Sequence, residues 1–280
     1  MRLRGIDFGN VLGASGVQNF GTKKYRHHYL YKMLFWRQFD FTGMTLVTKT
    51  TTPFWRDGNM PFNSDYVPEE WFPKCIKVKF WRGVVLNSIG LSNPGLSRLL
   101  GEWKHIYSPF LISIASTAGT TADRLENFRT MMDFIKYQRA EIPAPFGLQI
   151  NLSCPNTGHN PQETINETER VLEVCSRSAV PLMPKYSIAS APIEAMMELN
   201  DNPQCDAICV SNTLPFGWQE LDWKKIWGTT KSPLEKLGGG GLSGKPLCPL
   251  VTAWIRELRE KGFTKPINGG GGILTTKDVD

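Results

Sequence analysis

Short apolar runs alternate with helix-like segments along most of this chain, and this alternation restricts the fold more than any other feature. Amphipathic segments between apolar runs supply the crossovers that parallel strands require. The clearest helical pattern lies at 246–261, where Leu250, Trp254 and Leu258 fall on one stripe. Gly262 follows its end, as at many helix boundaries. The pattern predicts parallel βα units.

The whole chain, residues 1–280, is expected to form one α/β domain. The strands are expected at 10–14, 45–49, 110–115, 146–152, 182–185, 207–210 and 266–268, and the helices at 22–36, 122–139, 164–178, 191–199 and 246–261. Two aromatic-rich segments, at about 51–98 and 214–245, are expected to be long loop insertions that form a lid or pocket wall, with possible short strands at 78–80 and 84–86 in the first. After residue 273 too little chain remains for another helix and strand. We therefore expect a TIM (β/α)8 barrel that lacks its last βα unit.

Charge and cysteine usage exclude several classes of protein. The net charge is +6, but Lys and Arg are scattered, so no basic stripe predicts nucleic-acid binding. No apolar run reaches the roughly 18–20 residues of an integral membrane span. The N-terminus lacks the long apolar stretch of a secretory signal. The six cysteines form no Cys-x-x-Cys pair or metal-spaced cluster, and Cys205 and Cys209, which flank a probable strand start, are expected to be core residues. We expect a cytoplasmic protein without a bound metal.

A thiol between two carboxamides follows the apolar run at 146–150, in the segment NLSCPN at 151–156. Cys154 is either a buried structural residue or a base or nucleophile. Carboxamides such as those of Asn151 and Asn156 can bind a polar ring through paired donors and acceptors. Polar residues also follow other strands, and parallel strands bring such positions to one edge of a sheet. They are Ser15, Lys49, Asn87, Lys185 and Asn212. Together they predict a ligand site at the carboxyl ends of the strands.

Two glycine-rich turns, at 239–244 and 269–272, are either flexible linkers or anion sites. Glycines allow backbone N–H groups to approach an anion closely, and the first turn precedes the predicted helix at 246–261. Barrels often bind phosphate in the last loops of the sheet. The turns therefore predict a phosphate-bearing ligand.

The chain resembles the dihydroorotate dehydrogenases, FMN-containing (β/α)8 barrels of pyrimidine biosynthesis. The matching motifs are ASG at 14–16, KTTT at 49–52, DGN at 57–59, NSIGLSNPG at 87–95, NLSCPNT at 151–157, SNT at 211–213, GGLSGKPL at 240–247 and GGGI at 270–273. Cys154 matches the soluble, cysteine-base branch, whereas GGLSGKPL is more similar to the membrane-associated branch. No amphipathic helix pair precedes the barrel, which favours the soluble branch. Gln149 stands where the family usually has an acid, and the segment at 60–62 lacks the family's arginine.

The resemblance implies oxidation of dihydroorotate to orotate. Cys154 would be the catalytic base that removes a proton from C5, while C6 delivers hydride to the flavin N5. Substrate binding is implied for Lys49, Asn87, Ile89, Gly90, Leu91, Asn151, Asn156, Asn212 and Thr213. FMN binding is implied for Ala14, Ser15, Gly16, Lys49, Thr50, Asn151, Lys185, Gly244, Gly271 and Gly272. Lys185 would stabilise the anionic reduced flavin.

Two alternatives remain open at the level of the sequence: a flavin oxidoreductase acting on another dihydropyrimidine, and an inert truncated barrel. By resemblance alone we expect a homodimer and an electron-transfer partner. The electron acceptor is fumarate, a quinone or an NAD-linked subunit.

Overall fold

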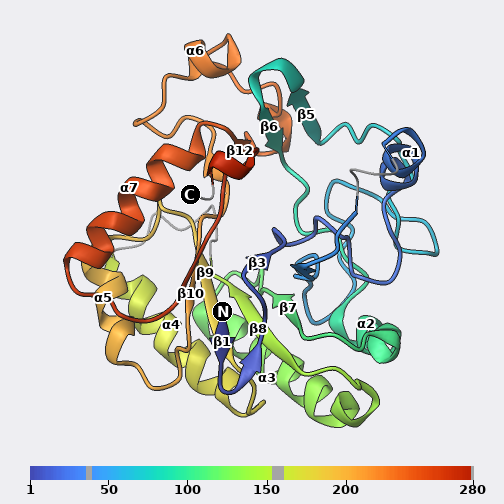
Figure 1. Ribbon diagram of the computed structural model, residues 1–280, viewed down its shortest axis with the longest axis vertical. Coiled ribbons are helices and arrows are strands. Elements are labelled where there is room, and N and C mark those ends of the chain that lie inside the picture. The colour runs from blue at the N-terminus through green and yellow to red at the C-terminus, as the bar shows by residue number, and fades with distance from the viewer. Residues whose placement is uncertain (36–39, 153–160, 279–280) are drawn as a thin grey trace.

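A five-stranded parallel sheet lies at the centre of the computed structural model, which describes residues 1–35, 40–152 and 161–278 (Figure 1). Its order is β13 (Ile267–Gly269), β10 (Ile208–Val210), β9 (Leu182–Tyr186), β8 (Phe146–Asn151) and β7 (Phe110–Ile114). Parallel bridges from Val47 to Leu111 and from Thr51 to Ile114 extend the sheet beyond β7. There, β4 (Met44–Thr45) pairs with β3 (Val11–Leu12). All seven expected strand runs therefore contain strand pairing.

The sheet is open within the described residues, because no strand ladder joins β13 to β3. The prediction of a mixed α/β fold with a parallel sheet is confirmed, whereas closure into a barrel is not tested. The β1 (Arg2–Leu3) and β2 (Ile6–Asp7) hairpin was not predicted. Its short strands carry no apolar run that sequence patterning could detect.

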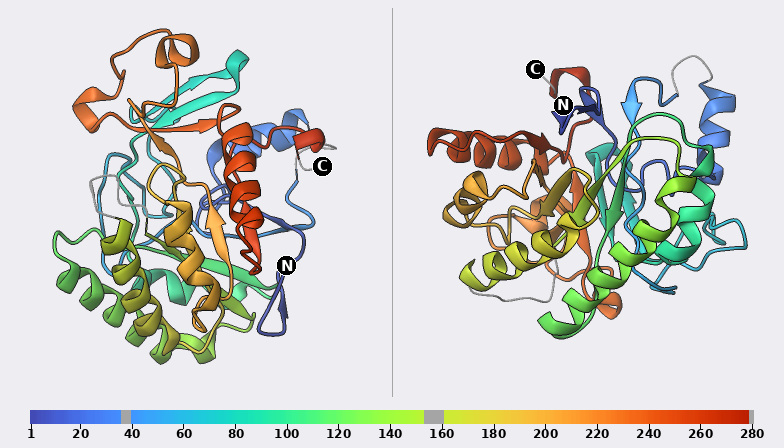
Figure 2. Two further views of the ribbon diagram at one scale, coloured as in Figure 1. Left: turned by 90° about the vertical axis from the view of Figure 1, so that its left-hand side faces the viewer. Right: turned by 90° about the horizontal axis from the view of Figure 1, so that it is seen from below.

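The helices pack side by side along the outer face of the sheet, in the order α2, α3, α4, α5, α7 (Figure 2). They are α2 (Leu96–Glu102), α3 (Thr121–Gln138), α4 (Pro161–Ser176), α5 (Ile193–Asp201) and α7 (Leu247–Glu260). Isoleucines of β7 and β8, such as Ile112 and Ile150, join Phe128 of α3 in one buried core. The expected helices at 122–139, 164–178, 191–199 and 246–261 are confirmed. The one expected at 22–36 is shorter, as α1 (Arg26–Leu34).

The inner face of the sheet is apolar at the amino ends of the strands. Val47, Leu111, Met183 and Ala207 form a second cluster with Leu3 of β1 and with Phe8, which follows β2. A Cβ on Gly147 would lie 2.9 Å from Leu111 Cδ2 and 3.3 Å from Phe8 Cζ, so the hairpin packs closely here because no side chain intervenes. The hairpin thus covers the amino ends and leaves the carboxyl ends for a ligand.

The two segments expected to be loops pair with each other. They supply an antiparallel sheet in the order β11 (Leu214–Pro215), β12 (Gly241–Gly244), β6 (Val84–Asn87) and β5 (Ile76–Lys79), together with α6 (Trp223–Trp227). Leu242 and Leu86 are paired and both fully buried. The possible short strands at 78–80 and 84–86 overlap β5 and β6 and are confirmed. Strands β11 and β12 were not predicted, and four of the six residues of the glycine turn at 239–244 belong to β12.

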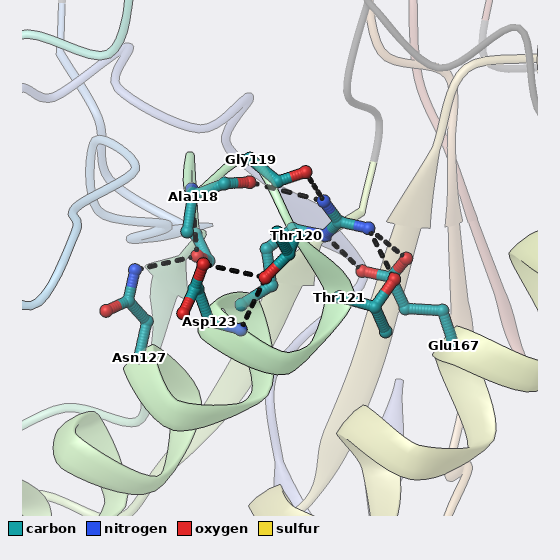
Figure 3. A network of polar contacts seen from close by, with 9 residues as sticks. Ala118, Gly119, Thr120, Thr121, Asp123, Asn127 and Glu167 are labelled. Carbon is teal, nitrogen blue, oxygen red and sulfur yellow. Dashed lines mark hydrogen bonds and ion pairs between the residues drawn. The ribbon is translucent and has the colours of Figure 1, made fainter.

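A buried ion pair fixes the loop that follows β7. Arg124 on α3 donates to both carboxylate oxygens of Glu167 on α4, at 2.5 and 2.6 Å. It also donates to the carbonyls of Ala118 and Gly119, at 3.2 and 3.0 Å (Figure 3). Thr120 caps α3 by accepting from the backbone N–H of Asp123. This network holds the carboxyl-end loop of β7 against two helices.

Candidate ligand site at the carboxyl ends of the strands

One row of the sheet carries four polar or ionisable residues. Asn151 pairs with Lys185, Lys185 with Cys209, and Cys209 with Asn268. Residues paired in this way point to the same face of the sheet. They lie on the inner face, two residues beyond Met183 and Ala207 of the apolar cluster. The face therefore changes from apolar to polar toward the carboxyl ends.

A chain of hydrogen bonds crosses the inner face and ends at two members of this row, Cys209 and Asn268. Ser15 and Thr50 are joined by their hydroxyls at 3.1 Å, and Thr50 and Ser113 at 2.8 Å. Longer contacts of 3.5 Å from Ser113 to Gln149 Oε1 and 3.6 Å from Gln149 Nε2 to the Cys209 sulfur continue it. The Asn268 amide ends the chain at 3.4 Å from the same sulfur. These contacts partner polar side chains that are buried at the centre of the sheet.

Burial raises the pKa of the Cys209 thiol, and the nearby charge of Lys185 lowers it in part. The thiol is thus protonated at neutral pH and accepts hydrogen bonds from two carboxamides. Cys209 was expected to be a core residue, and it is buried as expected. Its place on the polar inner face was missed, as were Ser113, Gln149 and Asn268. The sequence signal that could have identified these residues is the presence of a polar side chain inside an otherwise apolar strand.

Two predicted substrate-binding carboxamides lie together. The Asn212 side-chain amide donates to Asn151 Oδ1 at 3.0 Å. Asn151 is the last residue of β8, and Asn212 lies two residues after the end of β10. Asn212 is held by its backbone N–H, which donates to the Tyr186 carbonyl at 2.7 Å. Its own Oδ1 accepts from the Thr213 N–H at 2.9 Å. The pair is therefore pre-oriented at the end of the row that holds Lys185.

Asn87 and Thr213 come together through Gly241. Asn87 pairs with Gly241 across β6 and β12, and its amide lies 3.4 Å from the Gly241 carbonyl. A Cβ on Gly241 would lie 2.2 Å from Thr213 Oγ1, so the Thr213 side chain occupies that space. The antiparallel sheet thus joins the parallel sheet at the predicted substrate residues.

Lys49 lies in an apolar cage. Its ammonium nitrogen is 5.5 Å from the centre of the Phe20 ring and 5.3 Å from that of Phe62. It donates to the carbonyl of Ser92. Burial lowers the pKa of the Lys49 ammonium to about 7. The side chain is thus near the point of losing its charge at neutral pH.

The loop that holds Ile89, Gly90 and Leu91 is fixed from two sides. The Asn59 N–H donates to the Ile89 carbonyl at 2.8 Å, and Arg56 Nε donates to the Gly90 carbonyl at 2.8 Å. Gly90 and Leu91 both have positive φ, at 70° and 56°. The hydrogen bond from Lys49 to Ser92 connects this loop to the segment at 47–51, which bridges to β7. Gly16 lies against Lys49 as well, because a Cβ there would be 3.3 Å from Lys49 Cβ.

The predicted anion-binding glycines also meet. A Cβ on Gly272 would lie 2.6 Å from the Gly244 carbonyl and 2.8 Å from the Cys248 backbone nitrogen, at the start of α7. Gly271 has φ +116° and Gly244 has φ +108°, which favour glycine. A cleft of about 490 Å³ opens beside them. Its lining is Arg82, Val84, Ile226, Lys245, Pro246, Cys248, Pro249, Gly272 and Asp278.

Cys154 and Asn156 lie outside the described residues. Of the other predicted residues, Asn151, Lys185 and Asn212 form one group, and Ser15 and Thr50 lie on the chain beneath it. Ala14 precedes Ser15 in the turn after β3. Within residues 1–35, 40–152 and 161–278, no group of three or more His, Cys, Asp or Glu is placed to hold a metal ion. No helix of that part of the chain is long and apolar enough to cross a membrane.

The architecture is that of an α/β protein with a polar ligand site at the carboxyl ends of parallel strands. The family model described as dihydroorotate dehydrogenase matches residues 1–279, so the chain belongs to that family. It is 33% identical over 207 residues to the "Dihydroorotate dehydrogenase B (NAD(+)), catalytic subunit" of Bacillus mycoides strain KBAB4. It is 32% identical over 209 residues to the protein of the same name from Bacillus cereus strain AH187. Each match covers 70% of this chain, which spans 60% of the length of either relative.

Proposed function

We propose that this chain oxidises dihydroorotate to orotate with FMN, at the carboxyl ends of the strands of its parallel sheet. One observation carries the proposal. The side-chain amide of Asn212 is hydrogen-bonded to that of Asn151 at 3.0 Å. Asn151 is paired with Lys185 across the sheet and precedes Cys154 by three residues in the sequence. Amide donors and acceptors of this kind match the alternating N–H and C=O groups of a dihydropyrimidine.

The residues of the inner face fit FMN. The hydrogen-bonded chain that begins at Ser15 and Thr50 supplies polar contacts for the ring, and the fully buried apolar layer with Leu111 supports that chain from the amino ends of the strands. The glycines at 244, 271 and 272 meet at the start of α7, where backbone N–H groups and the helix dipole favour a phosphate. FMN, when bound, supplies a ring that accepts hydride from the substrate.

The chain's own residues would remove the proton from the substrate, orient its ring and stabilise the charge on the flavin. Cys154 takes the proton from C5, since a thiol with a reference pKa near 8.5 ionises more readily than a hydroxyl. Asn87, Asn151, Asn156 and Asn212 orient the ring and its carboxylate. Lys185 places a positive charge beside the flavin, and Lys49 contacts both ligands. Ile89, Gly90, Leu91 and Thr213 line the substrate side.

The names of the bacterial relatives favour one electron acceptor. Both are called catalytic subunits of an NAD(+) enzyme. We extend this to the present chain and propose that it acts in the cytoplasm as a homodimer that passes electrons to a separate NAD-linked subunit. The aromatic-rich segments at 51–98 and 214–245 contribute the strands of the antiparallel sheet. We propose that these segments distinguish dihydroorotate from other dihydropyrimidines.

A cysteine variant tests the proposed base. Cys154→Ala is expected to bind FMN as the wild type does, while the rate of flavin reduction by dihydroorotate near pH 7 falls by at least about 100-fold, the scale of general-base catalysis. The measurement is anaerobic stopped-flow absorbance. Cys175→Ala, which removes a thiol from the outer core, is the matched control and should keep the wild-type rate. Equal rates for Cys154→Ala and the wild type would refute the proposed base.

A further inference from the structure

The most exposed large apolar side chain among the described residues belongs to a hairpin that the proposed reaction does not use. The hairpin tip, residues 77–82, consists of the last three residues of β5 and the single helical turn that leads to β6. Trp81 is 95% exposed, Phe80 76% and Val78 59%. The Phe80 and Trp81 rings contact each other edge to face, at 5.5 Å between centroids. Exposed aromatic residues grouped in this way mark an interaction surface.

The hairpin tip is joined to α6 by basic side chains. Lys79 donates to the carbonyl of Trp227 and lies 5.1 Å from the centre of its ring. Arg82 donates to the carbonyls of Lys225 and Ile226, at 2.8 and 3.0 Å. Figure 1 and the left view of Figure 2 both place the β5–β6 hairpin and α6 together at one end of the molecule. The two segments therefore present one surface.

The charge of this surface has a single sign. Residues 77–82 and 223–228 contain five cations, namely Lys77, Lys79, Arg82, Lys224 and Lys225, and no carboxylate. The nearest acid in sequence, Asp222, caps α6 by accepting from the Lys225 N–H at 2.9 Å. The complementary surface must therefore be anionic and must also accept two aromatic rings.

A second copy of the chain does not meet these requirements. A symmetric contact would place the five cations of one copy against those of the other. Strand addition is opposed as well, because β5 is the outer strand of its sheet and carries Lys77 and Lys79. An anionic lipid surface fits both properties, since Trp and Phe favour the membrane–water interface and Lys and Arg are attracted to acidic headgroups.

We propose that the hairpin tip and α6 bind the surface of membranes that contain anionic phospholipid, with Phe80 and Trp81 inserted at the headgroup level. The inference does not depend on the reaction proposed above, because binding is read without substrate or turnover.

Vesicle sedimentation tests this proposal with the full chain. The wild type is expected to pellet with phosphatidylserine–phosphatidylcholine vesicles at least about ten times more than with pure phosphatidylcholine, and added salt should weaken binding. Phe80→Ala combined with Trp81→Ala, and separately Lys77→Gln combined with Lys224→Gln and Lys225→Gln, should each reduce binding about tenfold. Tyr137→Ala is the matched control. It removes an aromatic residue that is 88% exposed on α3, at the other end of the molecule.

Three results would overturn the proposal. The first is a wild type that stays in solution with the phosphatidylserine vesicles. The second is an aromatic double variant that pellets like the wild type. The third is a dimer in sedimentation velocity that Phe80→Ala with Trp81→Ala dissociates, since the surface would then bind a second copy. All variants change exposed side chains, and retained thermal unfolding transitions would establish that they fold.

Discussion

Lys49 is the residue whose ionisation depends most directly on the fold. Burial lowers the pKa of its ammonium in the folded protein to about 7, against 10.5 for an exposed lysine. Between these values the unfolded chain holds a proton that the folded chain has released. Stability contributed at this site therefore rises with pH from about 7 to 10.5, by about 1 kcal/mol per pH unit.

Urea unfolding at pH 7 and pH 9 measures this effect. The stability gained between the two pH values should be about 2 kcal/mol smaller in Lys49→Met than in the wild type. The exposed Lys104 is the control, and Lys104→Met should keep the wild-type dependence. If the free energy of unfolding of Lys49→Met and of the wild type rose equally between pH 7 and pH 9, the lowered pKa of the buried Lys49 ammonium would be contradicted.

At the residue scale, sequence patterning located the polar ends of the strands but not the polar layer beneath them. Asn151, Lys185 and Asn212 follow their apolar runs, so the end of each run located them. Gln149 and Ser113 stand inside such runs, and patterning alone does not show which face of a strand is buried against a helix and which faces a ligand. That distinction arises only when the register of the sheet is known.

At the scale of elements, the ion pair between Arg124 and Glu167 links α3, α4 and the loop after β7. Arg124 is 8% exposed, so removal of Glu167 takes two charge-assisted hydrogen bonds from a buried guanidinium. Glu167→Ala is expected to lower the free energy of unfolding by about 3 kcal/mol. Glu169→Ala, on the exposed face of the same helix, should change it by less than about 0.5 kcal/mol. Chemical denaturation of both variants decides this, and equal stabilities would contradict the role given to the pair.

The elements that sequence analysis identified are those whose partners lie near them in the chain. Strands β7, β8 and β9 are each an apolar run followed by a helix, and these local patterns were sufficient. The pairing of β6 with β12 was not predicted, because these strands are four residues each and more than 150 residues apart. Gly241–Gly244 also has little intrinsic preference for a strand. Pairing with Leu86 and the close approach of Gly83 and Gly244 select the strand instead.

At the scale of the molecule, ligand binding and lipid binding are assigned to different surfaces. The carboxyl ends of the strands bring together amide, hydroxyl and lysine side chains over an apolar layer, and the β1–β2 hairpin covers the opposite end. The polar chain from Ser15 to Asn268 connects strands that are far apart in the sequence. A flavin placed over it would contact most strands of the sheet and stabilise their arrangement, as any ligand specific for the folded state does.

The most direct test of this account is an anaerobic absorbance titration of the FMN-loaded chain. Addition of dihydroorotate should bleach the flavin band near 450 nm, roughly the position typical of flavins, with one substrate consumed per flavin, while dihydrouracil should leave the band unchanged. Bleaching by dihydrouracil alone would assign the site to another dihydropyrimidine. A chain that stays colourless after incubation with FMN, or a flavin that dihydroorotate does not reduce, would contradict the central claim.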